Sequence, residues 1–118
     1  VPLQCETLAH RGVGQLLRTV REVQQITNPN LPMLGAVATL FDARTTHSRD
    51  VLSDVADRYD LPVLSPPIPR TVRFAEASAS GSSVMRGRKN KGATAYRELA
   101  ENLWKHWDAG EDVRTLEF

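Results

Sequence analysis

The chain has 118 residues, 41% of them hydrophobic, and a formal net charge of +1. This length suits one domain and is too short for two, and the overall charge indicates no class of partner. One cysteine, Cys5, excludes an intrachain disulfide and is typical of a reducing compartment. No apolar run approaches the roughly 18 residues needed to cross a bilayer, and no signal peptide is visible.

Apolar runs alternate with helical periodicities from the first residue onward. Residues 1–4 predict the end of a strand, and residues 12–26 carry apolar side chains at helical spacing. Residues 28–30, Asn-Pro-Asn, end that helix. Residues 33–41 are mostly apolar, which is typical of a buried parallel strand.

The same alternation continues in the middle of the chain. Ser48 precedes a predicted helix with an apolar face, and residues 61–64 predict a short strand. Three prolines at 66, 67 and 69 forbid regular structure before Arg70. Strands that alternate with helices of this length predict right-handed crossovers and a parallel sheet.

The last third of the chain is predicted to be mainly helical. Residues 74–78 predict one helical turn, and residues 80–83 a flexible connection. Residues 93–107 carry a wide apolar stripe suited to packing on a sheet. Residues 1–107 are therefore predicted to form one α/β domain, and residues 108–118 a loosely ordered tail.

Two segments that follow the predicted strands carry the chemistry. Residues 41–45 read Phe-Asp-Ala-Arg-Thr, and residues 68–77 read Ile-Pro-Arg-Thr-Val-Arg-Phe-Ala-Glu-Ala. Each should lie at the carboxyl edge of the sheet, where open α/β sheets bind ligands. There the Asp42 carboxylate can accept a hydrogen bond from an exocyclic amine, or it can cap the turn or the following helix.

Together the two segments resemble the ParA/Soj family of chromosome- and plasmid-partitioning ATPases, from residue 1 to about residue 104. The resemblance implies the C-terminal half of a P-loop NTPase-type fold with a deviant Walker A motif. This is a mostly parallel sheet flanked by helices. It also implies that Asp42 reads the adenine base and that Pro69, Arg70 and Val72 belong to a loop that wraps it.

The resemblance further assigns Arg44 and Arg73 to a surface that binds DNA without sequence preference. An arginine suits that role because its charged fork meets phosphate oxygens at two points. A cluster of basic residues could add phosphate contacts or form a solvated loop: Arg86, Arg88, Lys89 and Lys91.

The sequence contains no glycine-rich loop ending in Gly-Lys-Ser/Thr, the motif that cradles the β- and γ-phosphates. Phosphoryl transfer depends on that positioning, so this chain alone is predicted not to hydrolyse ATP and to carry no catalytic residue. One Cys and three scattered His lack the spacing of a metal site. ATP and Mg²⁺ are therefore expected as cofactors of the intact family protein, with neither held securely by this part alone.

The family resemblance implies a set of partners. They are nonspecific double-stranded DNA, a ParB-type protein, a second copy of the ATP-bound protein, and the N-terminal half of the ATPase, with no membrane. It places the protein in the cytoplasm, associated with the nucleoid. A sheet with an unpaired edge also predicts that the isolated chain aggregates, dimerises or needs its missing half.

Two alternatives stay open. The chain could be a stand-alone degenerate paralogue that acts as a DNA-binding or interaction module without ATPase activity; an initiating Met just upstream of Val1 would favour this. It could instead belong to a sister family of MinD-like or capsule-regulating ATPases. The acidic character of residues 108–118 disfavours the membrane-targeting members, since it would repel anionic lipid.

Overall fold

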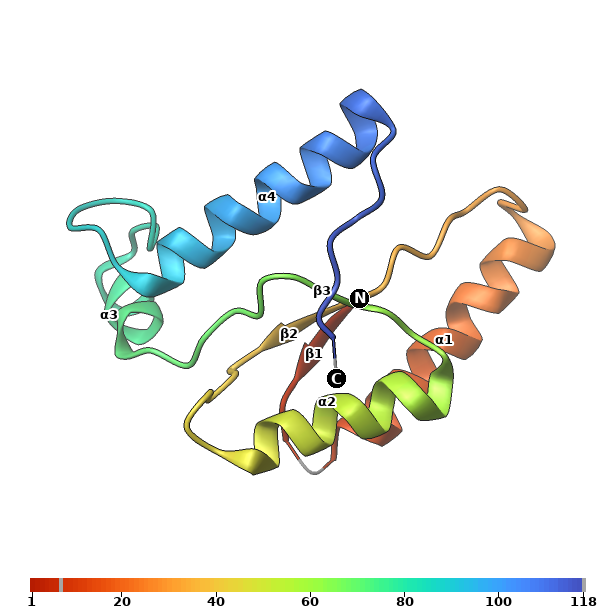
Figure 1. Ribbon diagram of the computed structural model, residues 1–118, viewed down its shortest axis with the longest axis horizontal. Helices are drawn as coiled ribbons and strands as arrows, with labels where there is room; N and C mark the ends of the chain where they lie inside the picture. Colours follow the sequence, from red (N-terminus) through yellow and green to blue (C-terminus); the bar gives the residue numbers. More distant parts are fainter. Residues whose placement is uncertain (7, 118) are drawn as a thin grey trace.

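The fold is a three-stranded parallel sheet with helices on both faces (Figure 1). The computed structural model of the chain describes residues 1–6 and 8–117. The elements in chain order are β1 (Pro2–Gln4), α1 (Ala9–Ile26), β2 (Ala36–Thr39), α2 (Thr46–Tyr59), β3 (Val63–Leu64), α3 (Val72–Ser80) and α4 (Lys91–Ala109). The predicted α/β class and the order of elements are confirmed.

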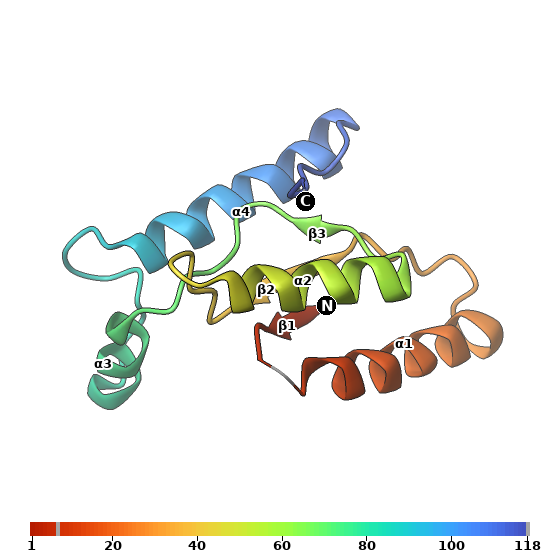
Figure 2. The same cartoon turned by 60° about the horizontal axis from the view of Figure 1, so that its bottom comes forward.

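The sheet has the order β1-β2-β3, with Leu3 opposite Ala38 and Val37 opposite Leu64. Helices α1 and α2 cover one face, and α4 lies across the other (Figure 2). This is the arrangement that two crossovers of the same hand produce, because each connection returns its helix to the same side of the sheet.

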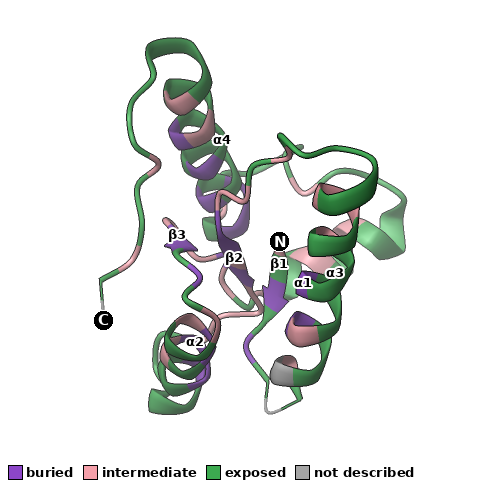
Figure 3. Cartoon of the chain, turned by 90° about the vertical axis from the view of Figure 1, so that its right-hand side faces the viewer, coloured by how far each residue is buried: buried purple, intermediate pink, exposed green. Residues whose placement is uncertain are grey.

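Strand alternation divides the core into two clusters, one on each face (Figure 3). Leu3, Ala38 and Val63 face α1 and α2, where the fully buried Leu52 and Val55 of α2 meet them. The neighbouring positions face α4 instead. This second cluster consists of Leu64, Ile68, Ala95 and Leu99. The partly buried Val37, Phe74 and Leu103 pack against it.

All four helices extend beyond their predicted bounds, and in two of them the capping residues show why. Helix α2 begins at Thr46 because Thr45, not Ser48, is the N-cap and accepts a hydrogen bond from the Ser48 amide at 3.4 Å. Helix α3 has nine residues instead of one turn, because the Thr71 hydroxyl caps its start and Gly81, at φ 65°, ends it.

The segment after α4 has little regular structure, but backbone hydrogen bonds hold part of it against the sheet. Thr115 forms an antiparallel bridge with Leu64. The Ser65 amide donates to the Arg114 carbonyl at 2.9 Å, and the Leu116 amide donates to the Val63 carbonyl at 2.8 Å. Residues 114–116 therefore cover the outer edge of β3, an arrangement that the pattern-poor sequence did not indicate.

Candidate nucleotide-binding site

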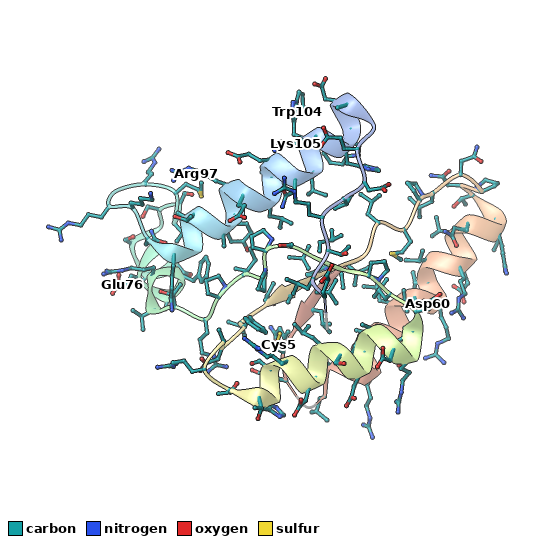
Figure 4. All side chains as sticks on the ribbon, viewed as in Figure 1. Cys5, Asp60, Glu76, Arg97, Trp104 and Lys105 are labelled. Atoms are coloured by element: carbon teal, nitrogen blue, oxygen red, sulfur yellow. The ribbon has the colours of Figure 1, made fainter. Side chains whose placement is uncertain are left out.

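A cleft of about 450 Å³ lies where β1 and β2 end. Its lining comes from the residues that directly follow these strands, including Cys5, Glu6 and Asp42, and from the start of α2. Arg70 enters the same cleft from the connection after β3. Cys5 marks this edge of the sheet in Figure 4. The volume lies within the range of small-molecule sites in proteins, roughly 300 to 1,000 Å³.

The two predicted segments meet at this edge through backbone contacts. The Phe41 amide donates to the Ile68 carbonyl at 3.0 Å, and the Arg70 amide donates to the Phe41 carbonyl at 2.9 Å. Pro69 forms a parallel bridge with Phe41. The Pro69–Arg70 peptide is thus held as a short continuation of the sheet beside the residue that precedes Asp42.

Asp42 is held tightly by its own turn. One carboxylate oxygen accepts hydrogen bonds from the Arg44 amide and Nε, both at 3.0 Å, and the other accepts from Arg44 Nη2 at 3.1 Å. These bonds to Arg44 hold the pKa of Asp42 below its usual value, and the charge of Arg70 adds to the effect. The Asp42 amide in turn donates to the buried Ser48 hydroxyl at 3.3 Å.

Asp42 therefore has the turn-capping role that was considered for it. Its carboxylate still has a position free to accept a hydrogen bond from a ligand. A carboxylate has about four lone-pair positions, and the Arg44 turn uses three of them. The remaining position can accept a hydrogen bond from a ligand amine in the cleft. Asp42 is 22% exposed and is kept ionised, which suits an acceptor of this kind.

The structure brings some of the predicted residues together and leaves others apart. Asp42 and Arg70 line one cleft, and Pro69 lies beside it. Val72 starts α3, is 70% exposed, and is not among the residues that line the cleft. A base stacked against Val72 would therefore sit at the outer rim rather than inside.

Arg44 and Arg73, the predicted DNA contacts, are both exposed and both ion-paired. Arg44 is 88% exposed and bonds Asp42, while Arg73 Nη1 donates to Glu76 Oε2 at 2.8 Å on α3. Exposed pairs of this kind contribute little to stability, so either arginine can exchange its carboxylate for a phosphate oxygen. The pairing itself could not be read from the sequence.

Three residues of the cleft had no assigned chemical role in the sequence. Glu6 approaches Arg70 at 3.6 Å, and His47 and Cys5 line the same space. Burial raises the pKa of the Cys5 thiol to about 11, so it stays protonated at neutral pH. A thiol in that state is a poor nucleophile, which fits a packing role for the buried Cys5.

The residues present fit the base side of a nucleotide and not its phosphate side. Asp42 offers an acceptor and Arg70 a charged fork, but the sequence has no Gly-Lys-Ser/Thr loop. Among residues 1–6 and 8–117, no group of His, Cys, Asp or Glu could hold a metal ion. Within the same residues no helix is both long enough and apolar enough to span a membrane.

Comparison with known proteins agrees with this geometry. Residues 5–84 match the model of the CobQ/CobB/MinD/ParA nucleotide-binding domain. The chain is 39% identical over 104 residues to the chromosome partitioning protein ParA of Caulobacter vibrioides and 36% identical to the sporulation initiation inhibitor protein Soj of Bacillus subtilis. Each match covers 87% of this chain and only 39% or 41% of the relative.

Solved structures show the same fold. The cobyrinic acid a,c-diamide synthase of Mycobacterium smegmatis, with bound ADP and magnesium, is 59% identical with a TM-score of 0.79. It covers 98% of this chain, which spans 40% of that one. A second structure of that protein holds an ATP analogue and magnesium. The chain belongs to the CobQ/CobB/MinD/ParA nucleotide-binding family and is a partial P-loop domain of the ParA/Soj-like type.

Proposed function

We propose that this chain supplies the adenine side of the nucleotide site, and a DNA-binding surface, in a ParA/Soj-type ATPase that segregates chromosomes or plasmids. The observation that carries the proposal is the meeting of Asp42 and Arg70 in one cleft at the carboxyl edge of the sheet. The two residues come from separate connections, and parallel strand ends of this kind are where α/β domains bind nucleotides.

Asp42 would distinguish adenine from guanine. Adenine presents an exocyclic amine, which donates to a carboxylate, where guanine presents a carbonyl, which repels one. Hydrogen bonds to charged groups contribute about 1.5 to 3 kcal/mol. Replacing Asp42 with Asn removes the charge and supplies a donor that guanine can use, so preference for ATP over GTP should fall about tenfold or more.

The test is nucleotide affinity of the full-length protein with and without Asp42→Asn. Because that change also removes the Arg44 ion pair, Arg44→Gln is the matched control: it breaks the same pair and keeps the carboxylate. Loss of base preference in Asp42→Asn alone supports the assignment. Equal ATP-to-GTP ratios in all three proteins would refute it.

The DNA part of the proposal rests on Arg44 and Arg73. Each is exposed and carried by a short segment next to the cleft's strand ends, so nucleotide binding and DNA binding would involve neighbouring parts of the chain. Arg44→Ala or Arg73→Ala should lower affinity for duplex DNA and flatten its dependence on salt. Unchanged binding at both low and high salt would count against this surface.

A second candidate comes from the Mycobacterium smegmatis relative, whose name describes amide formation on cobyrinic acid. The 59% identity favours it, while the nucleotide domain itself is common to both classes. Two activity assays distinguish the partitioning function from the synthase function. Stimulation by duplex DNA would support the partitioning function, and ATP-dependent amidation of a corrinoid carboxylate would support the synthase.

A further inference from the structure

A second cavity, of about 680 Å³, lies between α1 and the end of α2. Its lining includes four exposed arginines, Arg11, Arg18 and Arg21 from α1 and Arg58 from α2. We call it the α1–α2 arginine groove. Within the described residues none of the groups that line it is acidic.

These arginines differ from the two assigned to DNA in that, among the described residues, no ion pair engages them. In the part of the chain that the structure describes, the ion pairs within 4.0 Å are Arg44 with Asp42, Arg70 with Glu6 and Arg73 with Glu76. The groove therefore gathers four positive charges outside any of these ion pairs, in a molecule whose net charge is only +1. Charge gathered this way attracts an anionic partner.

The groove has a defined shape because one glycine allows two helices to approach. A Cβ on Gly14 would lie 3.0 Å from the Tyr59 hydroxyl, so only glycine lets Tyr59 lie against α1 without a shift. Arg11 and Arg18 are two turns apart on one stripe of α1, with Arg21 about one turn further. At 1.5 Å per residue the stripe spans about 15 Å.

We propose that the α1–α2 arginine groove binds the phosphate backbone of double-stranded DNA. One strand of a duplex carries a phosphate about every 3.4 Å along its axis, so a 15 Å stripe faces about four of them. Arginine forks meet phosphate oxygens at two points each. Rigid helices also hold the charges in place, which reduces the entropy lost on binding.

Other anionic partners fit the groove less well. Protein interfaces depend on buried aromatic or aliphatic anchors, and membrane-surface helices insert apolar side chains. The apolar side chains lining this groove are Leu17, which is buried, and Tyr59, which is partly buried against the core. A phosphate backbone needs charge alone, and charge is what the groove offers.

This inference shares its ligand with the proposed function and places it on a different surface. The test compares four forms of the full-length protein: wild type, a quadruple variant (Arg11→Gln, Arg18→Gln, Arg21→Gln, Arg58→Gln), a double variant (Arg44→Ala, Arg73→Ala), and Arg97→Gln. Arg97 is exposed on α4, beyond the sheet from the groove, beside Glu98 and Glu101 (Figure 4). Affinity for a short mixed-sequence duplex is measured between 50 and 200 mM salt, with melting temperature as the check on folding.

Each phosphate contact steepens the fall in affinity over this salt range by roughly threefold to fourfold. If all four arginines bind, the ratio of the affinities at 50 and 200 mM salt should therefore be about a hundredfold smaller for the quadruple variant than for wild type. Arg97→Gln should behave as wild type. A quadruple variant with wild-type affinity and slope overturns the groove, whatever the double variant does.

The remaining outcomes are equally decisive. If only the double variant loses binding, the proposed DNA surface stands and the groove is refuted. If the quadruple variant loses binding to anionic phospholipid vesicles but keeps DNA binding, the groove serves a lipid surface and the inference is wrong. Nucleotide affinity, measured in parallel, should be unchanged in the quadruple variant, since the groove and the nucleotide cleft share no residue.

Discussion

Gly35, which directly precedes β2, is a position where one added methyl group should strongly destabilise the fold. Its φ is +146°, a conformation that only glycine adopts readily. A Cβ there would lie 2.5 Å from the Pro62 carbonyl oxygen and 3.0 Å from a methyl of Leu64. The Pro62 oxygen cannot retreat freely, because it accepts the Ala36 amide at 2.8 Å and so joins β2 to the start of β3.

The expected cost of Gly35→Ala is the sum of two terms. Holding a non-glycine residue in this conformation costs about 1 to 3 kcal/mol. Crowding a packed interior costs about 1 to 3 kcal/mol more. The free energy of unfolding should therefore fall by about 2 to 6 kcal/mol, a large share of the 5 to 15 kcal/mol typical of a domain.

Urea unfolding of the purified protein, followed by far-ultraviolet circular dichroism, measures this loss. With a slope of about 2 kcal/mol per molar urea, the middle of the usual range, the midpoint should drop by roughly 1 to 3 M. Gly12→Ala is the control, because Gly12 lies inside α1 with nothing within 4 Å of its Cβ position. There alanine should stabilise the helix by up to about 1 kcal/mol. Equal midpoints for Gly35→Ala and wild type would refute the reasoning.

Three further predictions follow from single contacts. Asn102 is buried and donates from Nδ2 to the Ser65 carbonyl at 2.7 Å. Asn102→Leu should therefore lower the free energy of unfolding, measured in urea, by about 1 to 3 kcal/mol. No loss would show that the contact is dispensable. Removing the Arg44 side chain should raise the pKa of Asp42, seen as a carboxyl carbon chemical shift that titrates at higher pH, whereas an unchanged titration would contradict the hydrogen-bonded turn. Burial raises the pKa of Cys5 from 9.0 to about 11, so the native state keeps a proton that the unfolded chain loses. The free energy of unfolding should therefore decline as the pH rises from about 9 towards 11. Cys5→Ala should lessen that decline, measured as urea midpoints across this pH range.

Periodicity predicted the elements of this fold better than their ends. The apolar stripes of α1, α2 and α4 and the apolar run of β2 lie where the pattern placed them, because tertiary packing follows those stripes. The ends depend on single backbone conformations. β2 stops at Thr39 because Leu40 turns to φ 51°, and nothing in a run of apolar residues indicates such a turn.

The site was predictable in part for a related reason. A polar residue at the end of a strand indicates the ligand edge, which is why Asp42 was predicted to offer a hydrogen-bond acceptor there, whereas Arg70 was assigned only through the family resemblance. The partners of those side chains depend on loop geometry that sequence spacing does not fix. Three features therefore appear only in the folded chain: the Asp42–Arg44 turn, the approach of Glu6 to Arg70, and the arginine groove across two helices.

The exposed surfaces of the chain bear on how its functions should be tested. β1 pairs with β2 along one side, Pro2 and Gln4 are exposed, and Trp104 and Trp107 on α4 are 64% and 67% exposed. The chain spans only about 40% of the length of its relatives. This sequence has no phosphate-binding loop. Nucleotide and DNA measurements on the full-length protein therefore test the assigned residues, whereas the same measurements on this segment alone would test only whether it folds.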